Sequence, residues 1–158
     1  VRCGACELGV GYDMDWSRYV LEVEPMGEYE VILLSSSEFC HPDFVTHNQR
    51  KPVSLVTDEP DSIFRRRLEE YLRERNITLD ATLELWSIET IKRCVMSNLG
   101  FTYLPRFAAQ GELADGRLVE LIAPISGVRF PTLCARHKNR WVTPAMELFM
   151  RLLRETLN

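Results

Sequence analysis

Ser87 and the two residues that follow it form the group in this sequence that could bind a small anion. Serine is a preferred first residue of a helix, because its hydroxyl can accept a hydrogen bond from a free backbone N–H of the first turn. If a helix begins here, the N–H groups of Ile88 and Glu89 are free as well, and such a helix N-terminus attracts negative charge. Two interpretations stay open: an anion-binding site and a plain helix cap.

Thr57 is a second candidate for ligand binding, because it directly follows the short apolar run Val53–Val56. Runs of this kind are typical of strands that are buried on both faces of a sheet. Ligands of open α/β sheets bind outside the carboxyl ends of the strands. A polar side chain at that end of a strand is therefore placed where a ligand is expected.

Motifs for catalysis or metal binding are scarce. The sequence contains no P-loop, no nucleophile elbow, no dinucleotide-binding glycine motif and no zinc-protease helix. Cys3-x-x-Cys6 has the spacing of a zinc-binding or redox pair, but a zinc site needs two more ligands, and Cys40-His41 is the only other soft cluster. We interpret the pair as two incidental thiols and predict no metal, no cofactor and no enzymatic activity. We expect the histidines to be solvated or hydrogen-bonded at the surface: His41, His47 and His137.

The composition is that of a globular protein. An apolar fraction of 46% over 158 residues is enough for a buried core in one domain or two small lobes. The net charge of −4 argues against nucleic-acid binding by these residues, because affinity for duplexes rests mainly on Lys and Arg. The basic run Arg65–Arg67 alternates with acidic residues and is predicted to be a solvated helix face. There is no apolar run of membrane-spanning length and no signal peptide at the first residues, and an odd number of cysteines fits a reducing compartment.

Short strands alternate with helices along the chain, which indicates an α/β fold with mainly parallel pairing. We expect Gly100 to end the helix that starts at Ser87, in a left-handed conformation. We expect the closing helix to bury one face, formed by Met146, Phe149, Met150, Leu153 and Leu157. The predicted strands cover residues 8–12, 21–23, 30–34, 53–56, 81–85, 101–103, 118–121 and 130–135. The predicted helices cover residues 61–75, 87–98, 105–113 and the segment after Thr143, and residues 35–50 are predicted to form a crossover loop.

Several of these segments, taken in order, carry a resemblance to a known family. Ser87–Pro105 reads S-x-E-x-I-x-x-x-V-x-x-x-x-G-x-x-x-L-P and resembles the hinge helix and following strand of LysR-type transcriptional regulators, in their effector-binding domain. The other matching segments follow in the family's order. Glu7–Tyr12 resembles the D-L-G-I strand, Val23–Met26 with Tyr29–Leu34 the hairpin that leads into the crossover, Gly116–Leu121 the G-x-L-v-x-l segment, and Thr143–Ala145 with Phe149 the start of the last helix.

The resemblance implies an α/β fold like that of type 2 periplasmic-binding proteins, with two Rossmann-like lobes and a double crossover between them. On this basis residues 35–125 form a complete lobe two, and residues 1–34 with 126–158 form part of lobe one. The family's winged helix-turn-helix, its linker helix and the first strand–helix–strand unit of lobe one are expected to be absent from these 158 residues. The sequence leaves open whether this reflects a piece of a longer chain or a shorter protein.

The function implied by the resemblance is the sensing of a small polar or anionic molecule in a cleft between the lobes of a bacterial, cytoplasmic regulator. Ser87, with the N–H groups after it, and Thr57 would bind the effector from lobe two. Tyr12 would enter the cleft from lobe one, and Phe101 and Thr102 would line its wall; the alternatives are a packed aromatic for Tyr12 and a core residue for Phe101. A homodimer or homotetramer is implied, as is contact with promoter DNA only through the absent N-terminal domain, with no membrane partner. A solute-binding protein of the same fold and a small α/β enzyme are the alternative functions.

Overall fold

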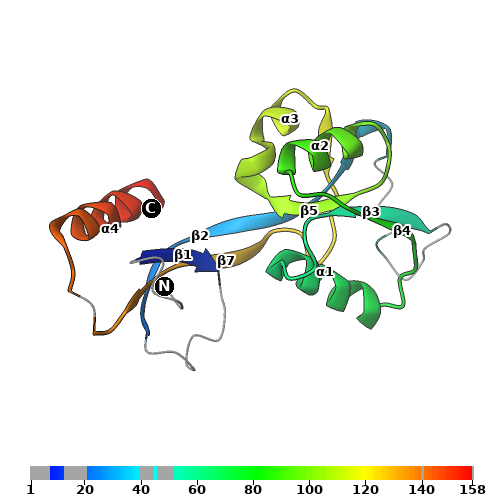
Figure 1. The fold of residues 1–158 in the computed structure, drawn as a ribbon. Helices are drawn as coiled ribbons and strands as arrows, with labels where there is room; N and C mark the ends of the chain where they lie inside the picture. The colour runs from blue at the N-terminus through cyan, green and yellow to red at the C-terminus, as the bar shows by residue number, and fades with distance from the viewer. Residues whose placement is uncertain (1–7, 13–20, 40–44, 46–51, 140, 158) are drawn as a thin grey trace. The chain divides into compact units, whose positions relative to one another are not determined.

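The computed structural model describes residues 8–12, 21–39, 45, 52–139 and 141–157. Two compact units can be distinguished by their internal contacts: unit 1, Val1–Tyr29 with Arg129–Asn158, and unit 2, Glu30–Val128 (Figure 1). None of the helices in the described part of the chain combines the length and the apolar character needed to cross a membrane. The elements are β1 (Leu8–Tyr12), β2 (Leu21–Ser36), η2 (Ser37–Phe39), β3 (Val53–Thr57), α1 (Ile63–Glu74), β4 (Leu79–Glu84), α2 (Ile88–Met96), β5 (Thr102–Pro105), η4 (Arg106–Ala109), α3 (Gln110–Ala114), β6 (Leu118–Glu120), β7 (Val128–His137) and α4 (Pro144–Leu157).

Unit 2 is built on strands that are covered by helices on both faces. β3 and β4 pair in parallel, and Phe101 forms a parallel bridge to Leu55 of β3 just before β5 begins. β5 and β6 each pair antiparallel with the second part of β2. α1 lies on one side of these strands, and α2 and α3 lie on the other (Figure 1).

The core of unit 2 lies between β2, β3, β5 and helix α2. It is apolar because the strands carry continuous aliphatic runs and α2 turns a stripe of aliphatic residues toward them. Each fully buried aliphatic side chain contributes about 1.5–3 kcal/mol relative to an exposed one. The cluster consists of Ile32, Leu34, Val56, Ile91, Val95, Leu104, Ala109 and Leu118.

Asparagines, rather than glycines, end the two longer helices of unit 2. Asn98 has a φ of 63°, and the N–H groups of Asn98 and Leu99 bond the carbonyls of Val95 and Cys94 in the pattern of a Schellman cap. Asn76, with a φ of 54°, ends α1 in the same way. The prediction that Gly100 ends α2 was therefore wrong, because Asn98 takes the left-handed position two residues earlier.

Unit 1 contains β1, the first part of β2, most of β7 and α4. β1 pairs antiparallel with β7, so that Tyr12 lies opposite Thr132. The rings of Tyr29 and Phe130 stack with centroids 6.3 Å apart, and Met146 is the buried residue at the start of α4. Phe149, which was predicted to face the core, is 46% exposed, because the described residues leave that side of α4 uncovered.

The structure corrects three predictions about elements. The pairing was expected to be mainly parallel, but β1–β7, β2–β5 and β2–β6 are antiparallel. The two strands predicted at residues 21–23 and 30–34 are parts of the single 16-residue strand β2. The helix predicted at residues 105–113 is split into the 3-10 turn η4 and the short helix α3. The remaining predicted strands and helices are present, with ends that differ by a few residues.

Candidate functional site

Ser87 caps α2, as predicted. Its hydroxyl oxygen accepts a hydrogen bond from the N–H of Thr90 at 3.4 Å, and its backbone is extended, with φ −128° and ψ 122°. The Ser87 carbonyl accepts the first helical bond from Ile91 at 2.9 Å. Ser87, Ile88 and Glu89 are all exposed, so the first turn of α2 is accessible to a ligand.

Thr57 lies beside the segment that leads into α2. Its carbonyl accepts a hydrogen bond from the N–H of Leu85 at 2.9 Å, which ties the end of β3 to the chain two residues before Ser87. Its side chain is buried, and its hydroxyl lies 3.2 Å from a carboxylate oxygen of Asp58, to which it donates. The structure therefore brings Thr57 and Ser87 to the same edge of unit 2, where β3 and β4 end.

Lys92 offsets part of the negative charge near this helix terminus. Glu89 lies in the first turn of α2, where its negative charge would repel an anionic ligand. The Lys92 ammonium lies 2.7 Å from the Glu89 carboxylate, and it also donates to Glu112 and to the Ala108 carbonyl, each at 2.9 Å. Burial lowers the pKa of Lys92, but the hydrogen bonds to both glutamates outweigh this, so the pKa is raised and the lysine stays charged. Sequence reasoning missed Lys92; its position one turn after Glu89 was the available signal.

Phe101 and Thr102 lie further from this edge than Thr57 does. Phe101 is opposite Leu55 in the parallel register, so Tyr103 rather than Phe101 is level with Thr57. Phe101 is fully buried, in agreement with its alternative interpretation as a core residue. Thr102 is 1% exposed, and its hydroxyl has no hydrogen-bond partner in the described part of the chain, which is rare for a buried polar group.

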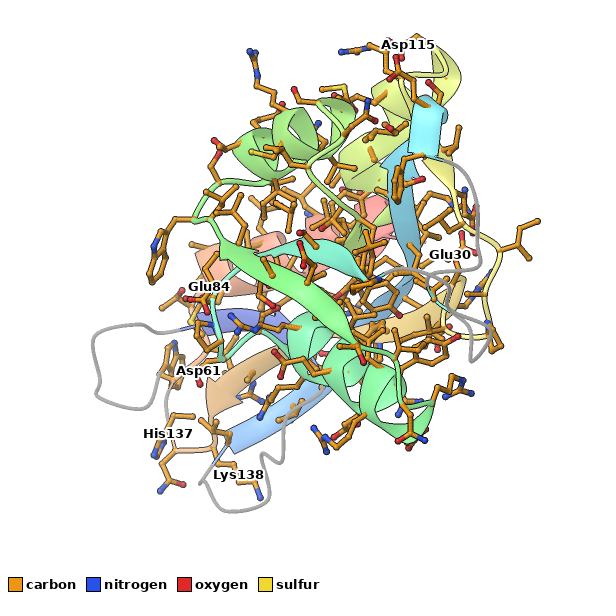
Figure 2. All side chains as sticks on the ribbon, turned by 90° about the vertical axis from the view of Figure 1, so that its right-hand side faces the viewer. Glu30, Asp61, Glu84, Asp115, His137 and Lys138 are labelled. Carbon is orange, nitrogen blue, oxygen red and sulfur yellow. The ribbon has the colours of Figure 1, made fainter. Side chains whose placement is uncertain are left out.

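Arg65 was expected on a solvated helix face, but its side chain is only 12% exposed. Its guanidinium lies 2.9 Å from the carboxylate of Glu84, at the end of β4 (Figure 2), and 2.8 Å from that of Glu69. It also donates to the Asp58 carbonyl at 3.3 Å. These bonds raise the pKa of Arg65, the contact with Glu69 being the largest cause. Arg65 thus joins α1 to the ends of β3 and β4, a role that charge patterning alone does not reveal.

The other sequence candidates do not join this group. Tyr12 lies in unit 1, opposite Thr132, and its ligand role stays a prediction. Burial raises the pKa of the Cys134 thiol, so this cysteine is not an activated nucleophile. The described residues include no group of three potential metal ligands. His137 accepts a hydrogen bond from the N–H of Asn139, while four further candidates lie outside the described residues: Cys3, Cys6, His41 and His47.

The groups at this edge of unit 2 are suited to binding a ligand and not to catalysis. Free N–H groups and a hydroxyl are presented at a helix N-terminus, with Lys92 holding the nearest carboxylate. Donors of this kind bind a carboxylate or a phosphate without any proton transfer or nucleophile.

Comparison with known families and proteins gives a consistent result. The family described as LysR substrate binding domain matches residues 1–158. The chain is 39% identical over 131 residues to YfiE of Escherichia coli, an uncharacterized HTH-type transcriptional regulator; the match covers 83% of this chain and 45% of YfiE. YwqM of Bacillus subtilis, another uncharacterized HTH-type regulator, is 30% identical over 154 residues, which are 95% of this chain and 52% of YwqM. The chain thus spans about half the length of the curated relatives it matches.

A solved structure of low sequence identity shows the same fold. The regulatory domain of Synechocystis CcmR, determined in complex with 2-PG, superposes with a TM-score of 0.78 at 15% identity, over 99% of this chain and 76% of that domain.

Proposed function

The chain belongs to the LysR substrate-binding domain family, and from this membership we propose that it binds a small polar or anionic effector at the N-terminus of α2. The domain is the effector-binding regulatory part of a LysR-type transcriptional regulator, a family without enzymatic activity. Effector binding would act through different affinities for two conformations of the regulator, with no bond made or broken.

The observation that supports this site most directly is the arrangement of Thr57, Ser87 and Lys92. The hydrogen bond from Leu85 to the Thr57 carbonyl holds the α2 N-terminus at the carboxyl edge of β3, where ligands of open α/β sheets bind. Lys92 keeps the charge of Glu89 paired at 2.7 Å, which reduces its repulsion of an anion. The CcmR regulatory domain was solved in complex with 2-PG, which supports the binding of a small molecule by a domain of this fold.

The partners of the whole regulator follow from the family and are part of the proposal. We propose that promoter DNA is bound through an N-terminal helix-turn-helix domain, as the names of the HTH-type relatives suggest, and that the full-length protein is a cytoplasmic homodimer or homotetramer. Family membership disfavours the alternatives of a solute-binding protein and a small enzyme. Roles for Tyr12, Phe101 and Thr102 in effector binding stay predictions.

Substitution of Ser87 tests the site in the full-length regulator. Small organic acids and phosphate esters, including 2-PG, are screened for those that raise its melting temperature. With such a compound, Ser87→Ala is expected to weaken binding by about 1–3 kcal/mol and to cost about 1 kcal/mol of stability through the lost cap. Ser87→Asp is expected to keep the stability, since aspartate caps a helix equally well. It is expected to abolish the rise in melting temperature that the ligand causes, because its charge repels an anion.

Ser97→Asp is the matched control, since it adds the same charge at the exposed opposite end of α2. We expect this variant to show the same rise in melting temperature with ligand as the unsubstituted regulator. A Ser87→Asp variant that retains the full rise with an anionic ligand would refute the anion site and leave the family assignment intact.

A further inference from the structure

A pocket in unit 2 shares no residue with the start of α2. It has a volume of about 160 Å³ and lies between the second half of α1 and the segment 124–128. This volume would hold about five water molecules, enough for a small organic molecule. Its lining is formed by Arg67, Tyr71, Glu74, Arg75, Pro124, Ile125 and Val128.

Two guanidinium groups give this pocket a positive character. Arg75 lies over the ring of Tyr71, with its guanidinium carbon 4.0 Å from the ring centroid. The cation–π contact holds the planar donor group in one orientation before any ligand arrives. The Tyr71 ring is itself fixed, because the residue is buried and its hydroxyl donates to the Val45 carbonyl at 3.1 Å. Arg75 is therefore a preorganised donor and not a freely rotating surface arginine.

Arg67 provides the second donor. Its ion pair is a long one of 3.8 Å to Glu70, and both side chains are more than half exposed, so the pair adds little stability and is easily exchanged for a ligand. Arg67 comes one turn before Tyr71 on α1, so both arginines border the same space. Among the described residues, Glu74 is the one carboxylate in the lining, 3.4 Å from Arg75, so the two arginines and this glutamate together carry a net charge of +1.

The opposite side of the pocket carries aliphatic side chains. Pro124, Ile125 and Val128 form this wall, and Ile125 is 3% exposed. The Ile125 carbonyl already accepts a hydrogen bond from the hydroxyl of Tyr103 at 3.1 Å. A ligand that fits both walls needs an anionic group for the guanidiniums and a short aliphatic part for the other side. Guanidinium groups bind carboxylates through paired N–H donors. The Glu74 carboxylate would repel a dianion more strongly than a monoanion.

We propose that this pocket binds a small organic monocarboxylate, with the carboxylate held by Arg67 and Arg75 and the aliphatic part against Pro124, Ile125 and Val128. The site is distinct from the proposed effector site at α2, and neither depends on the other. Val128 is the last residue of unit 2, so a ligand here would join α1 to the segment through which the chain leaves this unit.

The test uses sodium isobutyrate as the probe and the arginine Nε–Hε signals in NMR spectra of the 158-residue chain. Titration at constant ionic strength, balanced with sodium chloride, is expected to shift the Arg67 and Arg75 signals along one saturating curve. Arg75→Gln and Arg67→Gln are each expected to weaken binding about tenfold, because a charge-assisted hydrogen bond is lost. Glu74→Gln is expected to tighten binding about twofold, since an exposed repulsive charge is removed.

Arg73→Gln is the matched control, because Arg73 is exposed on the same helix and does not line the pocket. It is expected to leave the dissociation constant unchanged. Sodium formate, which lacks the aliphatic part, is expected to bind more weakly than isobutyrate. Shifts that grow linearly for all arginines, or an equal loss in Arg73→Gln, would overturn the proposal, as would weaker binding in Glu74→Gln.

Discussion

Gly100 occupies the position at which the chain passes closest to β3. Its N–Cα torsion φ is +147°, and a Cβ atom built there would lie 1.9 Å from the carbonyl oxygen of Ser54. That oxygen accepts a hydrogen bond from Phe101 at 3.0 Å, which begins the parallel bridge to β3. Any side chain at residue 100 would push this backbone contact apart, so glycine is required by close approach.

Replacing Gly100 by alanine is therefore expected to cost at least about 3 kcal/mol of the free energy of unfolding, since the bridge must move and the torsion is strained. Urea denaturation followed by circular dichroism measures the loss. Gly111→Ala is the control: a Cβ there meets nothing within 4 Å, and we expect it to gain about 0.5–1 kcal/mol. Equal stability of the two variants would contradict this account of Gly100.

Local sequence signals predicted the residues whose role depends on their immediate neighbours. The Ser87 cap was predicted because both of its signals are local. Serine is preferred as the first residue of a helix, and the aliphatic residues that follow Ser87 have helical spacing. The left-handed residue at the end of α2 was misassigned, because both Asn98 and Gly100 can adopt positive φ and only packing against Ser54 separates them. Lys92 was missed although Glu89 lies one turn before it, because its other partner, Glu112, lies 20 residues further along the chain.

At the scale of elements, the positions of strands and helices were predictable and their pairing directions were not. Alternation and apolar runs indicate that a strand exists, but they do not state which neighbour it pairs with. Residues 21–23 and 30–34 were predicted as separate strands, and the resemblance implied a hairpin, whereas β2 runs straight through Pro25, since proline fits an extended backbone and removes only one N–H donor. β2 runs through both units, and in unit 2 it pairs antiparallel with β5 and β6.

Lys92 links α2 to α3 through its ion pair with Glu112, and its removal is expected to be costly. Lys92→Met leaves the Glu112 carboxylate, which is 13% exposed, without its partner, and we expect a loss of about 3 kcal/mol in thermal or urea unfolding. The double variant Lys92→Met with Glu112→Gln is expected to recover part of this loss, because no charge is left unpaired. A double variant less stable than the single one would show that the pair itself, and not the orphaned carboxylate, dominates.

The same pair makes the stability of unit 2 depend on pH. The hydrogen bond from Lys92 is the main cause that lowers the pKa of Glu112 below 4.5, so this carboxylate stabilises the fold above that pH and loses its contribution as the pH falls through the lowered value. The pKa of Lys92 is raised, so on the alkaline side the contribution persists to above pH 10.5. Below about pH 4.5, the free energy of unfolding is accordingly expected to change less steeply with pH in Lys92→Met than in the unsubstituted chain.

At the scale of the whole molecule, the chain passes between its units twice, at residues 29–30 and 128–129. Arg106 in unit 2 links the segments next to both passages. It forms ion pairs with Glu30 of β2 (Figure 2) and, at 2.6 Å, with Glu120. Glu120 accepts a hydrogen bond from the Ser126 hydroxyl at 2.8 Å, and Ser126 in turn accepts one from the N–H of Leu33 at 3.2 Å. The two connecting segments are thereby fixed to each other and to the start of η4, where they enter unit 2.

Arg106→Met tests whether this network holds the connecting segments together. Without the guanidinium, Glu30 and Glu120 lose their common cationic partner, and we expect the bond from Leu33 to Ser126 to lose its alignment. Hydrogen exchange at the amides of Leu33 and Gly127, which bonds the Val31 carbonyl at 3.0 Å, is expected to accelerate about tenfold. Because the ion pairs are partly exposed, global stability is expected to fall by only about 1 kcal/mol.

Arg117→Met is the control for that measurement. Arg117 forms a comparable ion pair with Asp115 at 2.7 Å, but both side chains are exposed and lie at the turn between α3 and β6. Its loss should leave the exchange of Leu33 and Gly127 unchanged. If both variants exchange at the same rate as the unsubstituted chain, the backbone bonds of β2 alone hold the segments, and Arg106 does not control them. If only Arg106→Met exchanges faster, a single side chain sets how firmly both connections are anchored in unit 2.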